Sequence, residues 1–248
     1  MQEDQASSEK NEQGAARRQL RSAELVKRGA TMEDVAKEFE PAAQTPAEAI
    51  ARLKNGNARY FSNQSLRSPL SPLERRAQIV AQTPFAIVLG CADSRVPTEN
   101  IFDQSSGELF TIRVAGNVIG GNVLASIEYA IEHLKSHLVV VMGHEGCGAV
   151  NAAMLSEDKR RAEPENVQAL LERIVPAVNN LPKIRDAKAG MREAVIANVR
   201  LQVHELKQNP TVISAIERKQ IEVVGAYYEI SSGAVDFFET DEELRLEN

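Results

Sequence analysis

The sequence predicts an α/β fold, with a mainly parallel four-stranded sheet flanked by helices, a C-terminal edge strand and an N-terminal helical arm. Two observations support this prediction. Short apolar runs that end in glycine or in polar turns recur along the chain, and such runs are typical of strands buried on both faces. Helical patterns lie between these runs, and strands that alternate with helices indicate a parallel sheet with right-handed crossovers.

Residues 1–45 are expected to lie outside the main domain. Residues 1–14 are polar and without periodicity, which predicts a disordered start. Two amphipathic helical patterns follow, the second opened by the capping pair Thr31 and Asp34. Their apolar faces hold Ala16, Leu20 and Ala23, then Met32, Val35, Ala36 and Phe39. This arm could pack on the rest of the chain or a neighbouring subunit, or it could dock a separate protein partner, and the sequence leaves both open.

The main domain is predicted to span residues 46–248, starting at the capping box and first-turn proline of Thr45-Pro46-Ala-Glu48. The expected strands cover 85–90, 109–114, 138–143, 221–228 and 234–238. The expected helices start at Pro46 and near Gly146, and cover 72–82, 124–134, 165–180, 187–208 and 211–218. Residues 156–165 are expected to form a charged loop.

Composition excludes several classes of partner. The net charge is −6, and residues 239–248 contribute −4 of it through five acids and one base, which argues against nucleic acid. The chain has no Trp and four Tyr, so a base-stacking platform is also unexpected. No run of about 18 apolar residues and no secretory signal is present, so we expect a soluble, cytoplasmic protein without membrane contact.

Two of the predicted strands end in chemically reactive turns. Residues 85–90 lead into Cys91, Asp93 and Arg95, and residues 138–143 lead into His144 and Cys147. These are the only two cysteines of the chain, too few for a disulfide framework, although one structural bridge between them is an alternative. Two thiolates and one imidazole suit zinc, and three protein ligands leave a fourth position open for catalysis. Cys147 is expected in the first turn of a helix, whose dipole favours the thiolate.

The remaining groups of the first turn decide whether that position is open. Asp93 could orient a zinc-bound hydroxide, or it could ligate zinc itself and close the site. A bidentate pair with Arg95 would hold Asp93 off the metal and ionised. The other histidines, at positions 133, 137 and 204, are interpreted as structural or solvent-facing.

Cys91-Ala-Asp-Ser-Arg95 together with His144-Glu-Gly-Cys147-Gly148 resembles the β-class carbonic anhydrases over roughly residues 46–238. The resemblance implies a zinc ion held by Cys91, His144 and Cys147, with Asp93 and Arg95 as the catalytic pair and Gly148 in the substrate pocket. It implies reversible hydration of CO₂ to bicarbonate and a proton by zinc-bound hydroxide. It also implies a homodimer or homotetramer whose site lies near the subunit interface.

The plant-like branch of this family lines its CO₂ pocket with a glutamine, a phenylalanine and a tyrosine, which fall on Gln82, Phe110 and Tyr129. The other branch, which bicarbonate inhibits, has a tryptophan three positions before the first cysteine, where this chain has Val88. The resemblance therefore implies the plant-like branch and an open site near neutral pH. The alternatives are hydrolysis of CS₂ or COS at the same zinc site, and a non-catalytic zinc-binding scaffold that uses the N-terminal arm.

Overall fold

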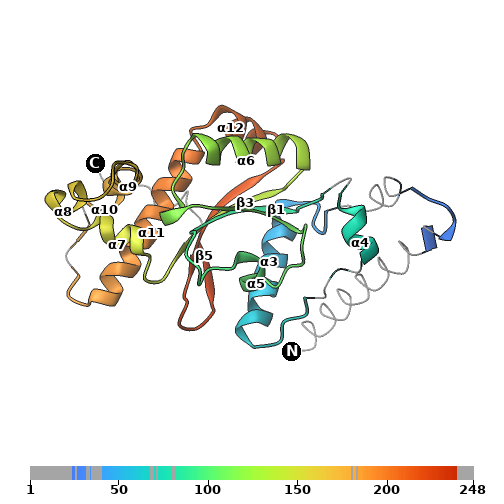
Figure 1. Ribbon diagram of the computed structural model, residues 1–248, viewed down its shortest axis with the longest axis horizontal. Helices are drawn as coiled ribbons and strands as arrows, with labels where there is room; N and C mark the ends of the chain where they lie inside the picture. The colour runs from blue at the N-terminus through green and yellow to red at the C-terminus, as the bar shows by residue number, and fades with distance from the viewer. Residues whose placement is uncertain are drawn as a thin grey trace.

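A single five-stranded sheet forms the centre of the structure, a computed structural model that describes residues 24–25, 27–31, 34, 41–67, 70, 72–79, 82–179, 181–182 and 184–238 (Figure 1). The strands are β1 (Ala86–Gly90), β2 (Leu109–Arg113), β3 (Leu138–His144), β4 (Glu222–Tyr228) and β5 (Val235–Phe238). Their order is β2-β1-β3-β4-β5, with β1 to β4 parallel and β5 antiparallel to β4. The predicted fold class, including the C-terminal edge strand, is confirmed.

Helices cover both faces of this sheet. They are α3 (Pro46–Phe61), α4 (Pro72–Ala77), α5 (Thr98–Ile101), α6 (Gly121–Leu134), α7 (Gly148–Ala153), α8 (Glu157–Arg161), α9 (Glu165–Leu171), α10 (Val175–Val178), α11 (Ala187–Leu206) and α12 (Pro210–Glu217), with a 3₁₀ turn η1 (Ala115–Asn117) after β2. Figure 1 shows α6 and α12 on one side of the sheet and α3 and α5 on the other, while α7 to α10 gather beyond one end.

The two faces of the sheet follow from the alternation of side chains along each buried strand. In β1, Ala86 and Val88 pack toward α3 and α5, whereas Ile87 and Leu89 pack toward α6, α11 and α12. A third apolar cluster lies at the carboxyl end of the strands and contains Cys91 together with residues of α7, α9, α10 and α11. Cys91 and Cys147, which follow β1 and β3, are both part of this third cluster.

Two helix caps predicted from the sequence, at Thr45 and at Thr31, are present in the structure. Thr45 accepts a hydrogen bond from Glu48 N at 3.2 Å, and α3 begins at Pro46, as predicted. Thr31 and Asp34 form the expected reciprocal cap, with Asp34 N donating to Thr31 Oγ1 at 3.1 Å. The apolar faces predicted for residues 16–39 and the acidic tail 239–248 lie outside the described residues. The division of the chain at residue 45 stays a prediction.

Two helix predictions and one loop prediction are wrong, each for an identifiable reason. The helix expected over 72–82 ends at Ala77, and the described side chains on either side of that end, Arg75, Arg76, Gln78 and Ile79, are exposed and offer little apolar burial to extend it. The helix expected over 165–180 is divided into α9 and α10 at residues 172–174, because Pro176, in the first turn of α10, cannot donate a helical hydrogen bond back to that segment. The charged segment 156–165 contains α8, whose acidic start, basic end and Glu157–Arg161 ion pair suit a helical turn. The helix expected from near Gly146 is present as α7, which begins at Gly148 because Gly146 has a left-handed φ of +66°.

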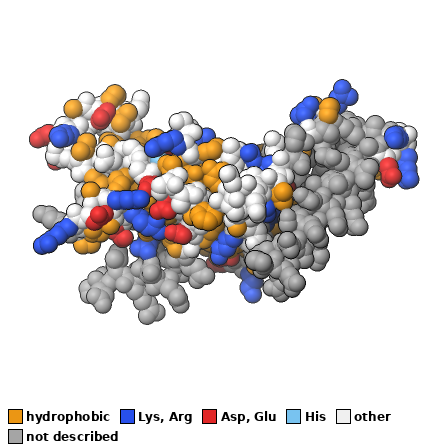
Figure 2. Space-filling view, turned by 90° about the horizontal axis from the view of Figure 1, so that it is seen from below, with side chains coloured by type: hydrophobic (Ala, Val, Ile, Leu, Met, Phe, Trp, Pro, Cys, Tyr) orange, Lys and Arg blue, Asp and Glu red, His pale blue; other side chains and the backbone are white. Residues whose placement is uncertain are grey.

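The described surface is mixed in character. On the face shown in Figure 2, Lys and Arg side chains are interspersed with Asp, Glu and hydrophobic side chains. No helix in the described part of the chain combines the length and hydropathy that a membrane span needs.

Candidate metal centre

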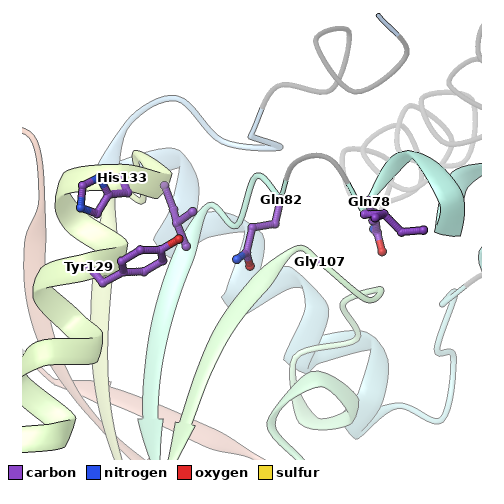
Figure 3. Close-up of a pocket in the computed structure, with 7 residues that line it drawn as sticks. Gln78, Gln82, Gly107, Tyr129 and His133 are labelled. Atoms are coloured by element: carbon purple, nitrogen blue, oxygen red, sulfur yellow. The ribbon is translucent and has the colours of Figure 1, made fainter. Parts of the chain in front are cut away.

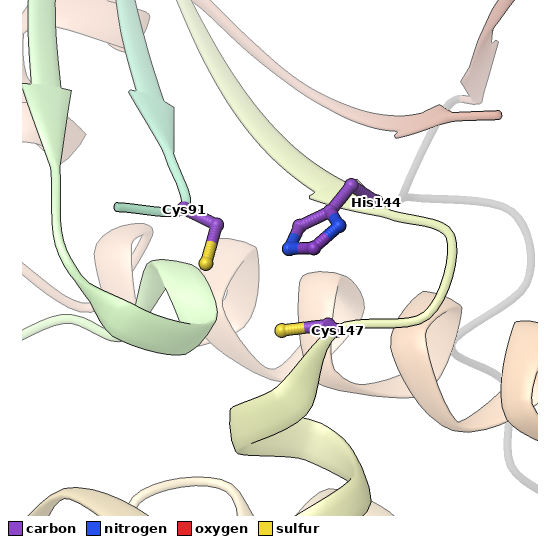
Figure 4. Close-up of side chains that lie close together, drawn as sticks. All are labelled: Cys91, His144 and Cys147. Carbon is purple, nitrogen blue, oxygen red and sulfur yellow. The ribbon is translucent and has the colours of Figure 1, made fainter. Parts of the chain in front are cut away.

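Three side chains converge at the carboxyl end of the sheet. Cys91 directly follows β1, His144 is the last residue of β3, and Cys147 is the residue that caps α7. Their ligand atoms all lie within 4.8 Å of one another, and Figure 4 shows the three side chains pointing into the same space. All three are buried, and the thiols are free rather than disulfide-bonded. A structural bridge between Cys91 and Cys147 is therefore not present.

The local backbone explains how β3 delivers its two ligands. A Cβ on Gly143 would lie 2.5 Å from Val195, so glycine allows α11 to pack directly against the strand before His144. Gly146 adopts a left-handed φ of +66° and turns the chain so that Cys147 faces back toward His144. The spacing of three residues between the two ligands thus results from a glycine turn, and Cys147 precedes the first helical turn instead of lying within it.

The imidazole of His144 is oriented for metal binding. Its Nδ1 lies 3.0 Å from the carbonyl oxygen of Glu145, an arrangement that assigns the proton to Nδ1 and leaves the Nε2 lone pair free. Within the described residues, Nε2 is buried and has no hydrogen-bond partner. A buried nitrogen with a free lone pair beside two thiols is what a zinc ligand set requires, so the three residues fit the metal.

The two thiols shift each other's pKa in opposite directions. The thiol of Cys147 donates to the sulfur of Cys91, which lowers the pKa of Cys91, while the same interaction and burial raise the pKa of Cys147. The backbone N–H of Gly116 also donates to Cys91 Sγ at 3.4 Å. Because two close thiolates repel each other, a bound cation would stabilise both of them in the ionised form.

Asp93 and Arg95 form the predicted pair beside these ligands. Arg95 Nε lies 3.0 Å from Asp93 Oδ1, Arg95 Nη2 lies 2.8 Å from Oδ2, and the backbone N–H of Arg95 donates to Oδ1 at 2.9 Å. These hydrogen bonds hold the pKa of the Asp93 carboxyl well below its usual range. Asp93 Oδ2 lies 3.9 Å from His144 Nε2, close to the ligands but beyond hydrogen-bond distance.

Arg113, the last residue of β2, supports the loop that carries Cys91 and Asp93. Its Nε donates to the carbonyl oxygen of Cys91 at 3.0 Å, and its Nη2 donates to the carbonyl oxygen of Asp93. No role for this arginine is predicted from the sequence. Its place at the carboxyl end of a strand beside β1 was the available indication, because such ends meet at one edge of a parallel sheet.

Glu145 has a corresponding place in the second loop, and the sequence analysis also left it without a role. Its carboxylate accepts a hydrogen bond from Ser231 N at 2.9 Å and pairs with Lys188 Nζ at 2.9 Å. The hydrogen bond from Ser231, followed by that from Lys188, lowers the pKa of Glu145 to about 2.

The predicted substrate residues do not join the metal centre within one chain. Gln82 precedes β1, Phe110 lies near the start of β2 and Tyr129 lies on α6, so these residues are near the amino ends of the strands. At about 3.3 Å per residue, β1 alone separates Gln82 from Cys91 by about 16 Å. The rings of Phe110 and Tyr129 lie 6.4 Å apart. Gly148, in contrast, directly follows Cys147 at the start of α7 and is exposed.

A cavity of about 580 Å³ lies at this second location, and Gln82, Tyr129 and His133 are among its lining residues (Figure 3). The other lining residues are Gln78, Ile79, Gly107 and Leu134. His133 packs against Tyr129 with ring centroids 4.9 Å apart. The sequence analysis considered this histidine only structural or solvent-facing. Its spacing of one helical turn from Tyr129 could have placed it on the same face of α6.

Comparisons with known proteins agree with this geometry. The family model described as carbonic anhydrase matches residues 86–235. A carbonic anhydrase from Mycolicibacterium smegmatis is 38% identical over 196 residues, which cover 77% of this chain and 92% of that protein. Beta carbonic anhydrase 3 from Arabidopsis thaliana is 27% identical over 217 residues, which cover 82% of each chain.

Solved structures with the same fold belong to the same class. One of two tetrameric β-carbonic anhydrases from Sordaria macrospora superposes with a TM-score of 0.63 at 27% identity, over 77% of this chain and 94% of that chain. The Coccomyxa β-carbonic anhydrase in complex with acetazolamide superposes with a TM-score of 0.59 at 26% identity, over 79% and 86%. The matched region contains both loops that hold the candidate metal ligands, and we conclude that this chain belongs to the β-class carbonic anhydrases.

Proposed function

We propose that this chain catalyses the reversible hydration of CO₂ to bicarbonate and a proton, at a zinc ion held by Cys91, His144 and Cys147. The observation that supports this most is the state of Asp93. Both oxygens of its carboxylate are engaged by Arg95, although Oδ2 lies only 3.9 Å from His144 Nε2. A carboxylate held in this way is kept from closing the metal site as a fourth ligand, which leaves room for water and substrate.

Zinc, when bound, supplies Lewis acidity and lowers the pKa of water so that a nucleophile is present near neutral pH. Two thiolates and a neutral imidazole balance the charge of the ion, so the ion would lower the pKa of water less than one held by neutral ligands. A nearby group must therefore help to activate the water. Asp93, kept ionised by Arg95, accepts a hydrogen bond from the attacking water at Oδ2 and thereby orients its lone pair toward CO₂. Arg95 fixes the direction of that acceptor through its bidentate contact.

We further propose that the substrate pocket is completed by a second copy of the chain. Gln82, Phe110 and Tyr129 lie near the opposite ends of the strands from the zinc ligands, so a single chain leaves each set incomplete. The pocket face also exposes apolar side chains: Ile79 is 83% exposed and Tyr129 is 49% exposed. Homo-oligomers are consistent with the tetrameric relatives from Sordaria macrospora. A chain that sediments as a monomer and retains full activity would contradict this arrangement.

The residues at these positions favour the plant-like branch. Gln82 can donate to a bicarbonate oxygen, and Phe110 and Tyr129 offer apolar walls for CO₂. Val88 occupies the middle of β1, where the bicarbonate-inhibited branch has tryptophan. We therefore expect activity near neutral pH without inhibition by bicarbonate at a secondary site. A lyase acting in the cytoplasm, with residues 1–45 available to a protein partner, remains our prediction.

Stopped-flow measurement of CO₂ hydration, with zinc content determined on the same sample, tests the proposal. The native chain should be active when zinc-loaded, and Asp93→Ala should retain zinc while its rate falls roughly 100-fold. A zinc-loaded native chain that is inactive between pH 7 and 9 would instead favour the non-catalytic scaffold. Release of sulfide from CS₂ or COS at a rate above CO₂ hydration would favour the sulfur substrates.

A further inference from the structure

Glu145 lies between His144 and Cys147, and its polar groups bond to several different elements. Its backbone N–H donates to the carbonyl oxygen of Tyr228 at 2.8 Å, and its own carbonyl oxygen contacts His144 Nδ1 at 3.0 Å. Its carboxylate reaches away from the metal centre, to Ser231 N at 2.9 Å and to Lys188 Nζ at 2.9 Å. One residue therefore connects the second ligand loop to β4, to the hairpin after β4 and to α11.

Ser231, the partner of Glu145 in the β4–β5 turn, belongs to a turn that is held by hydrogen bonds. Ser231 lies in the turn between β4 and β5, and Asn57 of α3 holds that turn from below the sheet. Asn57 Nδ2 donates to the carbonyl oxygen of Gly233 at 2.9 Å, and its Oδ1 accepts from Val235 N at 2.8 Å. Since Asn57 is 6% exposed, the N–H of Ser231 is presented by a well-anchored turn.

Lys188, the partner of Glu145 in α11, lies at an electrostatically unfavourable end of its helix. Lys188 lies in the first turn of α11, where the helix dipole disfavours a positive charge. Asp186 caps that helix by accepting from Ala189 N at 2.7 Å, which fixes the position of the first turn. The ion pair with Glu145 therefore offsets an unfavourable placement of Lys188.

A surface ion pair without further consequence is the alternative explanation. Lys188 is 68% exposed, and exposed ion pairs contribute little to stability. The carboxylate side differs, because the Glu145 side chain is only 19% exposed and accepts a charge-assisted hydrogen bond from a backbone N–H. Most of the restraint should accordingly come from Ser231, with a smaller part from Lys188.

We propose that Glu145 is a positioning residue, which holds the loop of His144 and Cys147 in its metal-binding geometry by tying it to the β4–β5 turn and to the start of α11. The inference rests on the zinc centre proposed above. It concerns retention of the metal, because the hydrogen bonds and the ion pair described for Glu145 act on the loop after β3 and leave the loop of Cys91 and Asp93 untouched.

The test measures zinc release to a chelator and the absorption spectrum of the Co(II)-substituted protein. Glu145→Ala should release zinc roughly 10-fold faster and shift the thiolate-to-cobalt bands, since partners of metal ligands typically contribute this much to metal retention. Glu145→Gln keeps an oxygen for Ser231 N but loses the negative charge, so it should release zinc only about 2-fold faster than native, as should Lys188→Ala. Glu157→Ala is the matched control, because it removes an exposed Glu–Arg pair in α8 and should leave both readouts at their native values.

The outcomes separate this inference from the proposed function. A native chain that binds no zinc would refute the metal centre itself. Native-like zinc release and an unchanged cobalt spectrum in Glu145→Ala would overturn only the role of Glu145, and so would an equal effect of the control Glu157→Ala. If Glu145→Ala does not fold, Glu145→Gln and Lys188→Ala decide: release about 2-fold faster in both supports the inference, and native rates in both overturn it.

Discussion

The two loops that bring the ligands together are held in different ways. The loop after β1 is held through its backbone, since Arg113 donates to the carbonyl oxygens of Cys91 and Asp93. The loop after β3 is held through a side chain of its own, Glu145, which reaches β4–β5 and α11. The first loop leaves Asp93 and Arg95 19% and 55% exposed, whereas His144 has a fully buried side chain.

This difference suggests that the two loops have different roles. The loop after β3 is the fixed part of the metal centre, and the loop after β1 presents the groups that water and substrate meet. Substitutions in the loop after β3 should therefore mainly reduce metal retention. Changes around Asp93 should reduce turnover while zinc remains bound.

The largest effect is expected in the fixed loop. His144→Ala removes the one nitrogen ligand, whose Nε2 has no other partner among the described residues. Zinc content measured by mass spectrometry should fall well below one ion per chain, and CO₂ hydration should fall to the uncatalysed background. A variant that keeps stoichiometric zinc would show that His144 is not a ligand.

Arg95→Lys tests the exposed loop and should have the next largest effect. A lysine ammonium cannot make the bidentate contact with Asp93, so the carboxylate loses its fixed direction. We expect kcat to fall roughly 30-fold at unchanged zinc content. Loss of zinc in parallel with activity would show that the pair also serves the metal, which would remove the proposed contrast between the loops.

Arg113→Lys should have a smaller effect on the same loop. A lysine lacks the guanidinium fork that reaches the two carbonyl oxygens from two separate nitrogens, so Cys91 and Asp93 become less well placed, and kcat/KM should fall roughly 10-fold. Arg160→Lys is the matched control, since Arg160 also donates to two backbone carbonyls, those of Ala153 and Leu155, at the far end of α7. Equal losses in both variants would indicate a general effect of arginine replacement.

The smallest effect concerns the packing under the fixed loop. Gly143→Ala would place a Cβ 2.5 Å from Val195, and overpacking of this kind should lower the free energy of unfolding by about 1 kcal/mol or more. Gly148→Ala is the control, because its Cβ would have no neighbour within 4 Å and should change stability by less than about 0.5 kcal/mol. Urea unfolding of both variants measures the difference, and equal stabilities would contradict the close packing of α11 on β3.

Much of the fold and the ligand set could be predicted because their patterns are local. The strand expected over 85–90 is observed as Ala86–Gly90, since a buried parallel strand is a continuous apolar run bounded by Pro84 and a polar turn. Cys91 and Cys147 were identified as partners because each follows such a run. Because the carboxyl ends of parallel strands lie at the same edge of a sheet, the two cysteines are then expected to lie close together.

Other features depend on contacts that the sequence does not encode locally. Arg113 acts on backbone carbonyls, which every residue possesses, so no residue type marks its targets. The break between α9 and α10 is not predicted, because the apolar pattern continues from one helix into the other. The position of Gln82, Phe110 and Tyr129 near the opposite ends of the strands follows from the topology of the sheet, which motif spacing alone does not reveal.

A crystal structure of the zinc-loaded protein at pH 8 tests the central claim most directly, because it locates the Asp93 carboxylate relative to the metal. We predict zinc bound by Cys91, His144 and Cys147, with Asp93 paired to Arg95 as in the present structure. Asp93 bound to zinc at that pH, with Arg95 released, would contradict an open site and the role proposed for the loop after β1.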